Sequence, residues 1–162
     1  MFEILGGDFI ESEQKICIFF GHRNTGSEIR PTLYAEIEKH ITDYGVTTFY
    51  HGGKGSFDWL ADSVLQELKK KYPSIEIYEI LYKMPGKKEY EPEKDGVETI
   101  YPEGLETAPP KFAITKRNKW MVQECTHLIA CVRFTWGGAY DAMELAKRKK
   151  KHVINLADQS RT

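Results

Sequence analysis

The fold of this chain is decided by residues 116–151, which read KRNKWMVQECTHLIACVRFTWGGAYDAMELAKRKKK. The apolar run from Leu128 to Val132 is too short for an isolated buried helix and has the length of a strand covered on both faces. The chain then turns at Gly137 and Gly138, and a helix is predicted from Ala139 to Lys150. Glycines at such a junction either make a plain turn or let an anion approach the unpaired N–H groups of the helix.

The same succession of strand, loop and helix repeats along the chain. Apolar runs predict further strands at residues 15–20, 46–50, 75–81 and 152–156. Helical periodicity predicts helices between residues 27 and 45, at residues 56–71 and from about residue 111. Alternating strands and helices pair in parallel with right-handed crossovers. The sequence therefore predicts an α/β fold: a single Rossmann-like domain over residues 1–162, with a mainly parallel sheet and helices on both faces.

Three segments fall outside this succession. Residues 1–14 predict a small hairpin around a two-glycine turn. Residues 83–110 hold five of the seven prolines, which predicts a loop inserted within the domain, with a short strand at residues 97–101 inside it. Residues 157–162 are predicted to be a frayed tail.

The composition excludes several classes of protein. An apolar content of 41% is too high for a disordered chain. The 23 basic and 24 acidic residues give a net charge of −1, which disfavours a surface that coats nucleic acid. The three cysteines form no CxxC or Cys/His spacing, so we expect buried reduced thiols, no metal and no cofactor. Neither a signal peptide nor a membrane helix is expected, which favours a cytoplasmic location.

Three loops that follow predicted strands are rich in glycine or polar residues. They span residues 21–26, 51–58 and 135–140. In a parallel sheet all three lie at the carboxyl edge, where their N–H groups and the following helix termini can bind an anion. Neither a Walker loop nor a GxGxxG motif is present. The three loops together predict a site for a nucleotide-like or phosphate-containing ligand.

Four short motifs resemble a known family. They are GHR at residues 21–23, GG-x-G-x-FD at residues 52–58, KRN-x-x-M at residues 116–121 and GG-x-Y at residues 137–140. In this order they are similar to the YspA-like proteins of the SLOG superfamily. That Rossmann-like group also contains the DNA-processing protein DprA/SMF and the LOG enzymes. The resemblance extends from Cys17 to Leu156, apart from the proline-rich loop.

The LOG enzymes are nucleoside-monophosphate phosphoribohydrolases, and part of their signature is present. Arg117 and Met121 keep the spacing of its first half, while Gly137, Gly138 and Glu144 keep the spacing of PGG-x-GT-x-x-E. The resemblance implies that Arg117 holds a phosphate or the leaving base and that Glu144 stabilises the ribose. The alternatives are a surface arginine on a basic helix for Arg117 and, for Glu144, a solvated glutamate that faces Arg148 at i+4.

Other positions depart from that signature. Trp136 stands where the family has proline, and Tyr140 and Asp141 replace the Gly-Thr that wraps the phosphate. A tyrosine cannot allow the close backbone approach of a glycine. Trp136 and Tyr140 either stack on a base or cap the core beneath the loop. Asp58 either complements the dipole of its helix or accepts ribose hydroxyls.

These observations give one set of candidate residues. In the enzymatic interpretation the catalytic residues are Glu144 and Arg117. The candidate ligand-binding residues are Gly21, His22, Arg23, Gly52, Gly53, Lys54, Gly55, Ser56, Asp58, Arg117, Trp136, Gly137, Gly138 and Tyr140.

Three functions are compatible with such a site. We expect binding of a nucleotide-derived small molecule at the carboxyl edge of the sheet, by a sensor or a sequestering protein. The first alternative is hydrolysis of an N-glycosidic bond, as in the LOG enzymes. The second, single-stranded DNA binding of the DprA type, is disfavoured by the balanced charge. Assembly into a homodimer or a larger homo-oligomer stays open.

Overall fold

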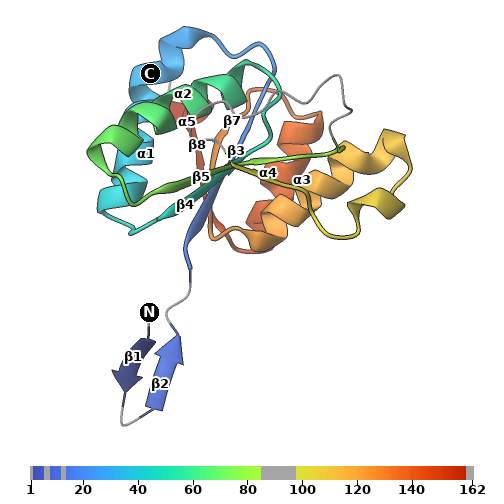
Figure 1. The fold of residues 1–162 in the computed structure, drawn as a ribbon. Coiled ribbons are helices and arrows are strands. Elements are labelled where there is room, and N and C mark those ends of the chain that lie inside the picture. The colour runs from blue at the N-terminus through green and yellow to red at the C-terminus, as the bar shows by residue number, and fades with distance from the viewer. Residues whose placement is uncertain (1, 6–7, 12–13, 85–97, 160–162) are drawn as a thin grey trace.

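The centre of the molecule is a six-stranded sheet in which every neighbouring pair of strands is parallel (Figure 1). The computed structural model describes residues 2–5, 8–11, 14–84 and 98–159. The strand order is β6-β5-β4-β3-β7-β8. The strands are β3 (Ile16–Gly21), β4 (Thr48–His51), β5 (Glu76–Ile80), β6 (Glu98–Ile100), β7 (His127–Cys131) and β8 (His152–Asn155).

Helices cover both faces of the sheet, as the alternating sequence predicts (Figure 1). One face carries α1 (Arg30–Thr42), α2 (Ser56–Lys71) and the short α5 (Leu156–Gln159). The other carries α3 (Ala113–Glu124) and α4 (Gly138–Arg148). The α/β Rossmann-like fold is therefore confirmed.

The direction of chain travel reverses beside β3. From β3 the chain steps outward through β4 and β5 to the edge strand β6, and it then returns to lay β7 and β8 on the other side of β3. The loops after β3 and β7 consequently lead to helices on opposite faces. In open parallel sheets this reversal leaves a crevice at the carboxyl ends of the strands, where ligands bind.

The segments outside the main succession differ from one another. The predicted hairpin is confirmed by β1 (Phe2–Leu5) and β2 (Asp8–Glu11), which pair antiparallel, although its two-glycine turn lies outside the described residues. The strand expected in the proline-rich segment is β6, and residues 85–97 of that segment also lie outside.

The predicted frayed tail is wrong for its first residues. The chain forms α5 there, and Ala157 is buried in the core beside Leu156. Residues 160–162 lie outside the described part. The three cysteines are free and buried, as expected. Within the described ranges, no helix is long and apolar enough to cross a membrane.

Candidate ligand-binding site

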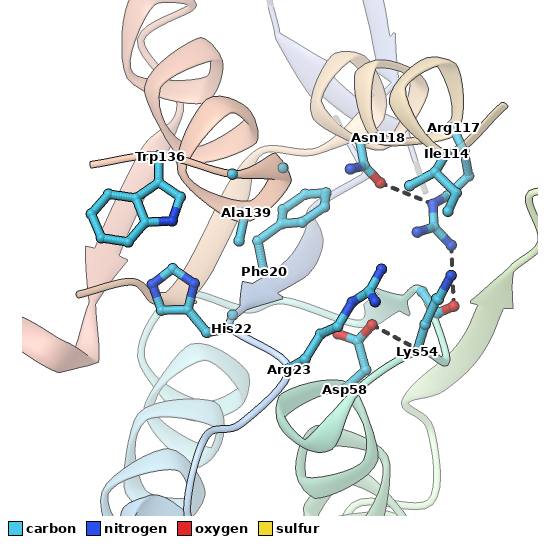
Figure 2. A pocket seen from close by; sticks show the side chains of 14 residues that line it. Phe20, His22, Arg23, Lys54, Asp58, Ile114, Arg117, Asn118, Trp136 and Ala139 are labelled. Atoms are coloured by element: carbon cyan, nitrogen blue, oxygen red, sulfur yellow. Dashed lines mark hydrogen bonds between the residues drawn. The ribbon is translucent and has the colours of Figure 1, made fainter. Parts of the chain in front are cut away.

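A cavity of about 270 Å³ opens at the carboxyl edge of the sheet, where the strand order reverses (Figure 2). Its walls come from the loops that follow β3 and β4, from α3, and from the start of α4. The lining residues are Phe20, Gly21, His22, Arg23, Gly52, Lys54, Asp58, Ile114, Arg117, Asn118, Trp136, Gly137, Gly138 and Ala139.

Two of the glycines at this edge share one backbone conformation. Gly55, before α2, has φ 95° and ψ 167°, and Gly137, before α4, has φ 97° and ψ 170°. Essentially only glycine adopts these angles. Within the described residues no side chain caps either helix. The first N–H of α2, that of Ser56, donates to the Arg23 carbonyl, whereas the first N–H groups of α4 are left for water or a ligand.

Ser56 joins the first two loops rather than lining the cavity. Its hydroxyl donates to the Arg23 carbonyl at 2.7 Å, and its backbone N–H donates to the same oxygen at 3.1 Å. A Cβ on Gly55 would lie 3.2 Å from the Cα of Arg23, so the two loops are in close contact. Ser56 therefore sets the position of Arg23.

Arg117 is only 4% exposed, so it is not the surface arginine of the alternative interpretation. Its Nη1 donates to the carbonyls of Gly52 at 3.1 Å and Ile80 at 2.9 Å, and its Nε donates to Oδ1 of Asn118 at 3.0 Å. Burial lowers the pKa of the guanidinium, and the nearby Asp58 opposes that change. A Cβ on Gly52 would lie 2.8 Å from Nη1, so the glycine makes room for this contact.

Asp58 is buried in the first turn of α2, and Oδ2 accepts a hydrogen bond from the backbone N–H of Lys54 at 3.2 Å. Burial raises the pKa of its carboxyl group from 3.8 to about 6, although the charges of His51 and Arg117 oppose this change. Among the described lining residues, Asp58 supplies the one carboxylate.

Three basic side chains outnumber that carboxylate. Arg23, Lys54 and Arg117 all line the cavity. Figure 2 shows the Arg23 side chain extending from the β3 loop toward the middle of the cavity. The Lys54 ammonium lies 5.1 Å from the centre of the Tyr82 ring, a distance at which the ring attracts a cation. The charges of the site therefore favour an anion.

The structure brings most of the predicted site residues to this cavity. Those that line it are Gly21, His22, Arg23, Gly52, Lys54, Asp58, Arg117, Trp136, Gly137 and Gly138. Those that do not are Gly53, Gly55, Ser56, Tyr140 and Glu144.

The contacts and exposure of Glu144, Tyr140 and Trp136 decide between the alternative interpretations of these residues. Glu144 accepts a hydrogen bond from Lys147 at 3.4 Å on α4, so its side chain pairs with a lysine at i+3. Tyr140 packs against the buried cluster beneath α3 and α4, which fits the core-capping alternative. Trp136 is 65% exposed and therefore does not cap the core.

Sequence reasoning missed four residues that line the cavity: Phe20, Ile114, Asn118 and Ala139. Phe20 precedes Gly21 at the end of β3, and Ala139 follows the glycine pair, so both adjoin predicted positions. Ile114 and Asn118 are one helical turn apart on α3 and flank Arg117. That helical spacing was the signal available for both.

No family model matches this chain, and no curated protein matches it in sequence. Solved structures do match its fold. The DNA processing protein A (DprA) from Streptococcus pneumoniae matches with a TM-score of 0.60 at 15% identity, over 86% of this chain and 49% of that one. The molybdenum cofactor carrier protein from Chlamydomonas reinhardtii gives a TM-score of 0.55 at 18% identity, over 86% and 75%.

DprA from Helicobacter pylori, a protein described with a single-stranded DNA binding mode, matches with a TM-score of 0.55 at 12% identity, over 86% of this chain and 63% of that chain. This chain spans about half the length of the S. pneumoniae protein. At these identities the similarity shows a common Rossmann-like fold.

Proposed function

We propose that this chain binds a nucleotide-derived small molecule at the carboxyl edge of its sheet, as a sensor or a sequestering protein. One observation carries the proposal: three basic side chains and the uncapped amino end of α4 converge on one cavity at the strand reversal. The motif order and the fold shared with DprA support a place among the YspA-like proteins of the SLOG superfamily. One structural neighbour is, by name, a carrier of a small cofactor.

The parts of the ligand can be assigned to parts of the cavity by charge. A phosphate fits between Arg23 and the amino end of α4 at Gly138, where a guanidinium and unpaired N–H groups are available. Within the described residues, no hydrogen bond or ion pair occupies the Arg23 guanidinium, whereas Arg117 already holds two carbonyls. Asp58 is suited to accept the hydroxyls of a ribose.

Binding without turnover fits the site better than hydrolysis. Glycosidases of the common type use two carboxylates on either side of the scissile bond. Glu144, the expected catalytic carboxylate, pairs with Lys147 and does not line the cavity. A hydrolase would have to rely on Asp58 alone. We therefore propose a binding protein and treat release of a free base as the result that would favour the enzyme.

Isothermal titration calorimetry tests the proposal with AMP, ADP-ribose, cyclic nucleotides, inorganic phosphate and an oligothymidylate. We expect at least one nucleotide to bind and Arg23→Ala to weaken that binding about 10-fold or more, because a charge-assisted contact with phosphate is lost. The matched control is Arg30→Ala, whose guanidinium pairs with Glu67 on the outer surface of the helices. Chromatography of the mixture detects any free base.

Failure of every nucleotide to bind would contradict the proposed function. Tight binding of the oligothymidylate alone would favour a function like that of DprA instead. Equal effects of the two arginine substitutions would show that Arg23 contributes only general positive charge.

A further inference from the structure

A row of three rings stands at the mouth of the cavity, and we call it the aromatic ledge: His22, Phe134 and Trp136. The Phe134 and Trp136 rings are stacked, with centroids 4.6 Å apart and planes 22° apart. The His22 and Phe134 centroids are 4.8 Å apart. Trp136 is 65% exposed and Phe134 42%, so neither ring is part of the core.

The backbone that carries the ledge is fixed from two sides. Nε2 of His22 accepts hydrogen bonds from the backbone N–H groups of Arg133 at 2.9 Å and Phe134 at 3.2 Å. On the other side, Asn155 exchanges two hydrogen bonds with the backbone of Val132, at 3.0 and 2.9 Å. The exposed rings therefore stand on a loop that is held in place before any ligand arrives.

The hydrogen bonds also determine the state of the histidine. An imidazole nitrogen that accepts two N–H groups carries no proton, so the ring is neutral with its proton on Nδ1. Burial and the charge of Arg133 lower the pKa of His22, which agrees with this state. The rings beside the cavity are consequently uncharged and suited to stacking.

The ledge faces the basic half of the site across the cavity. Trp136 and His22 both line the cavity, and Figure 2 shows them on one side with Arg23 and Asp58 on the other. Phe134 covers one face of the Trp136 indole, which leaves its second face open. The open indole face therefore lies beside the basic side chains of the cavity. This arrangement matches a ligand with a flat ring at one end and an anion at the other.

We propose that the open face of Trp136 is the subsite for the base of the ligand, so that the site selects nucleotides over sugar phosphates and inorganic phosphate. This inference rests on the proposed function, because it concerns the same cavity. Stacking uses the π-face that every base has, so the ledge accepts purines and pyrimidines alike. His22 acts as a positioning residue that holds the ledge through Arg133 and Phe134.

The test compares AMP with ribose 5-phosphate, which differ by the base. We expect the wild type to bind AMP about 10-fold or more tightly than ribose 5-phosphate, the range that base stacking contributes. Trp136→Leu should remove this preference and leave the affinity for ribose 5-phosphate unchanged. The control is Phe112→Leu, which removes another exposed ring, 52% exposed, that does not line the cavity.

Two substitutions of His22 examine the positioning role. His22→Ala should lower the preference for AMP over ribose 5-phosphate, and His22→Gln should restore it, because the glutamine oxygen can accept the same N–H groups. Circular dichroism and melting curves establish that each variant is folded. A variant that binds ribose 5-phosphate like the wild type is folded at the site as well.

The outcomes separate this inference from the proposed function. Equal affinities for AMP and ribose 5-phosphate in the wild type, or an equal loss of both in Trp136→Leu, would overturn the base subsite while phosphate binding stands. No binding of any of these compounds would overturn both. Preferential binding of an oligothymidylate that Trp136→Leu abolishes would assign the ledge to single-stranded nucleic acid and overturn the small-molecule subsite.

Discussion

Asp58 is a buried carboxylic acid in the wall of the cavity. Burial disfavours its charged form, and the pKa of the carboxyl group rises from 3.8 to about 6. The carboxylate nevertheless lies among three cations that line the same cavity. A buried acid that destabilises the fold at neutral pH is retained most easily where it serves ligand binding.

Asp58→Asn should therefore have opposite effects on stability and binding. The folded protein holds the Asp58 proton more tightly than the unfolded chain does, so the cost of the ionised carboxylate is full above pH 6 and absent below pH 3.8. Removing the charge should raise the free energy of unfolding at pH 7.5 by up to about 3 kcal/mol, with no gain near pH 4. Urea unfolding at both pH values measures this difference.

The same variant should bind AMP more weakly, because a neutral amide is a poorer acceptor for ribose hydroxyls than a carboxylate. Its affinity for inorganic phosphate should stay the same or increase, since a negative charge has been removed from an anion site. Tighter binding of both compounds would show that Asp58 makes no contact with the ribose.

At the scale of the elements, the site depends on how α2 and α4 begin. Both helices follow a glycine with nearly the same backbone angles, although their loops differ in length and sequence. Within the described residues neither helix has a capping side chain, so the positive end of each helix dipole is not neutralised by a side chain. Two helices from opposite faces thus present their positive ends to the same edge.

Gly137→Ala tests the need for this conformation. A Cβ at Gly137 would meet nothing within 4 Å, so the penalty is the backbone strain at φ +97° alone, about 1–3 kcal/mol. We expect a lower free energy of unfolding in urea and weaker AMP binding. Gly138→Ala is the matched control for stability, because its Cβ would lie 3.7 Å from Asn118 and alanine favours a helix. Equal stability of the two variants would contradict the assigned strain.

At the scale of the whole molecule, the edge opposite the cavity holds a cluster of histidines. His40, His127 and His152 have ring centroids 4.9 to 5.8 Å apart and surround Tyr44. His40 is fully buried, and its Nδ1 donates to the Glu36 carbonyl at 2.8 Å. Among the described residues its Nε2 has no hydrogen-bond partner, and no cluster there could hold a metal ion.

This cluster should make the fold sensitive to acid. The pKa of His40 is lowered from 6.5 to about 4, mainly by burial and to a lesser extent by the charges of His127, His152 and Lys39, although the hydrogen bond with the Glu36 carbonyl opposes this change. The unfolded chain therefore binds the proton more readily, and stability should fall as the pH drops from 6.5 toward 4. The contribution of Asp58 has the opposite sign in this window, so the wild type alone shows only the sum.

His40→Asn isolates the contribution of the histidine. Asparagine keeps an N–H for the Glu36 carbonyl, and any loss of packing affects both pH values alike. Between pH 7 and pH 4.5 the variant should lose about 2–3 kcal/mol less of its free energy of unfolding than the wild type. Urea unfolding measures the two differences, and parallel losses in the two proteins would exclude His40 as the sensitive group.

The sequence by itself determined the fold and most of the cavity wall. The apolar runs and helical periods are local patterns, and they predicted the parallel sheet with helices on both faces that the structure has. The three loops could be assigned to one site because parallel strands all end at the same edge. Ten of the predicted site residues line the cavity, and nine of them, all but Arg117, belong to these loops.

Only the tertiary structure decided which side chains face the ligand. Arg117 and Glu144 both keep the spacing of the LOG signature, yet Arg117 is buried at the cavity wall and Glu144 pairs with Lys147. The contact between His22 and Phe134 joins residues 112 positions apart. A local pattern states which residues share a face of an element, whereas the neighbours of that face depend on how the elements pack.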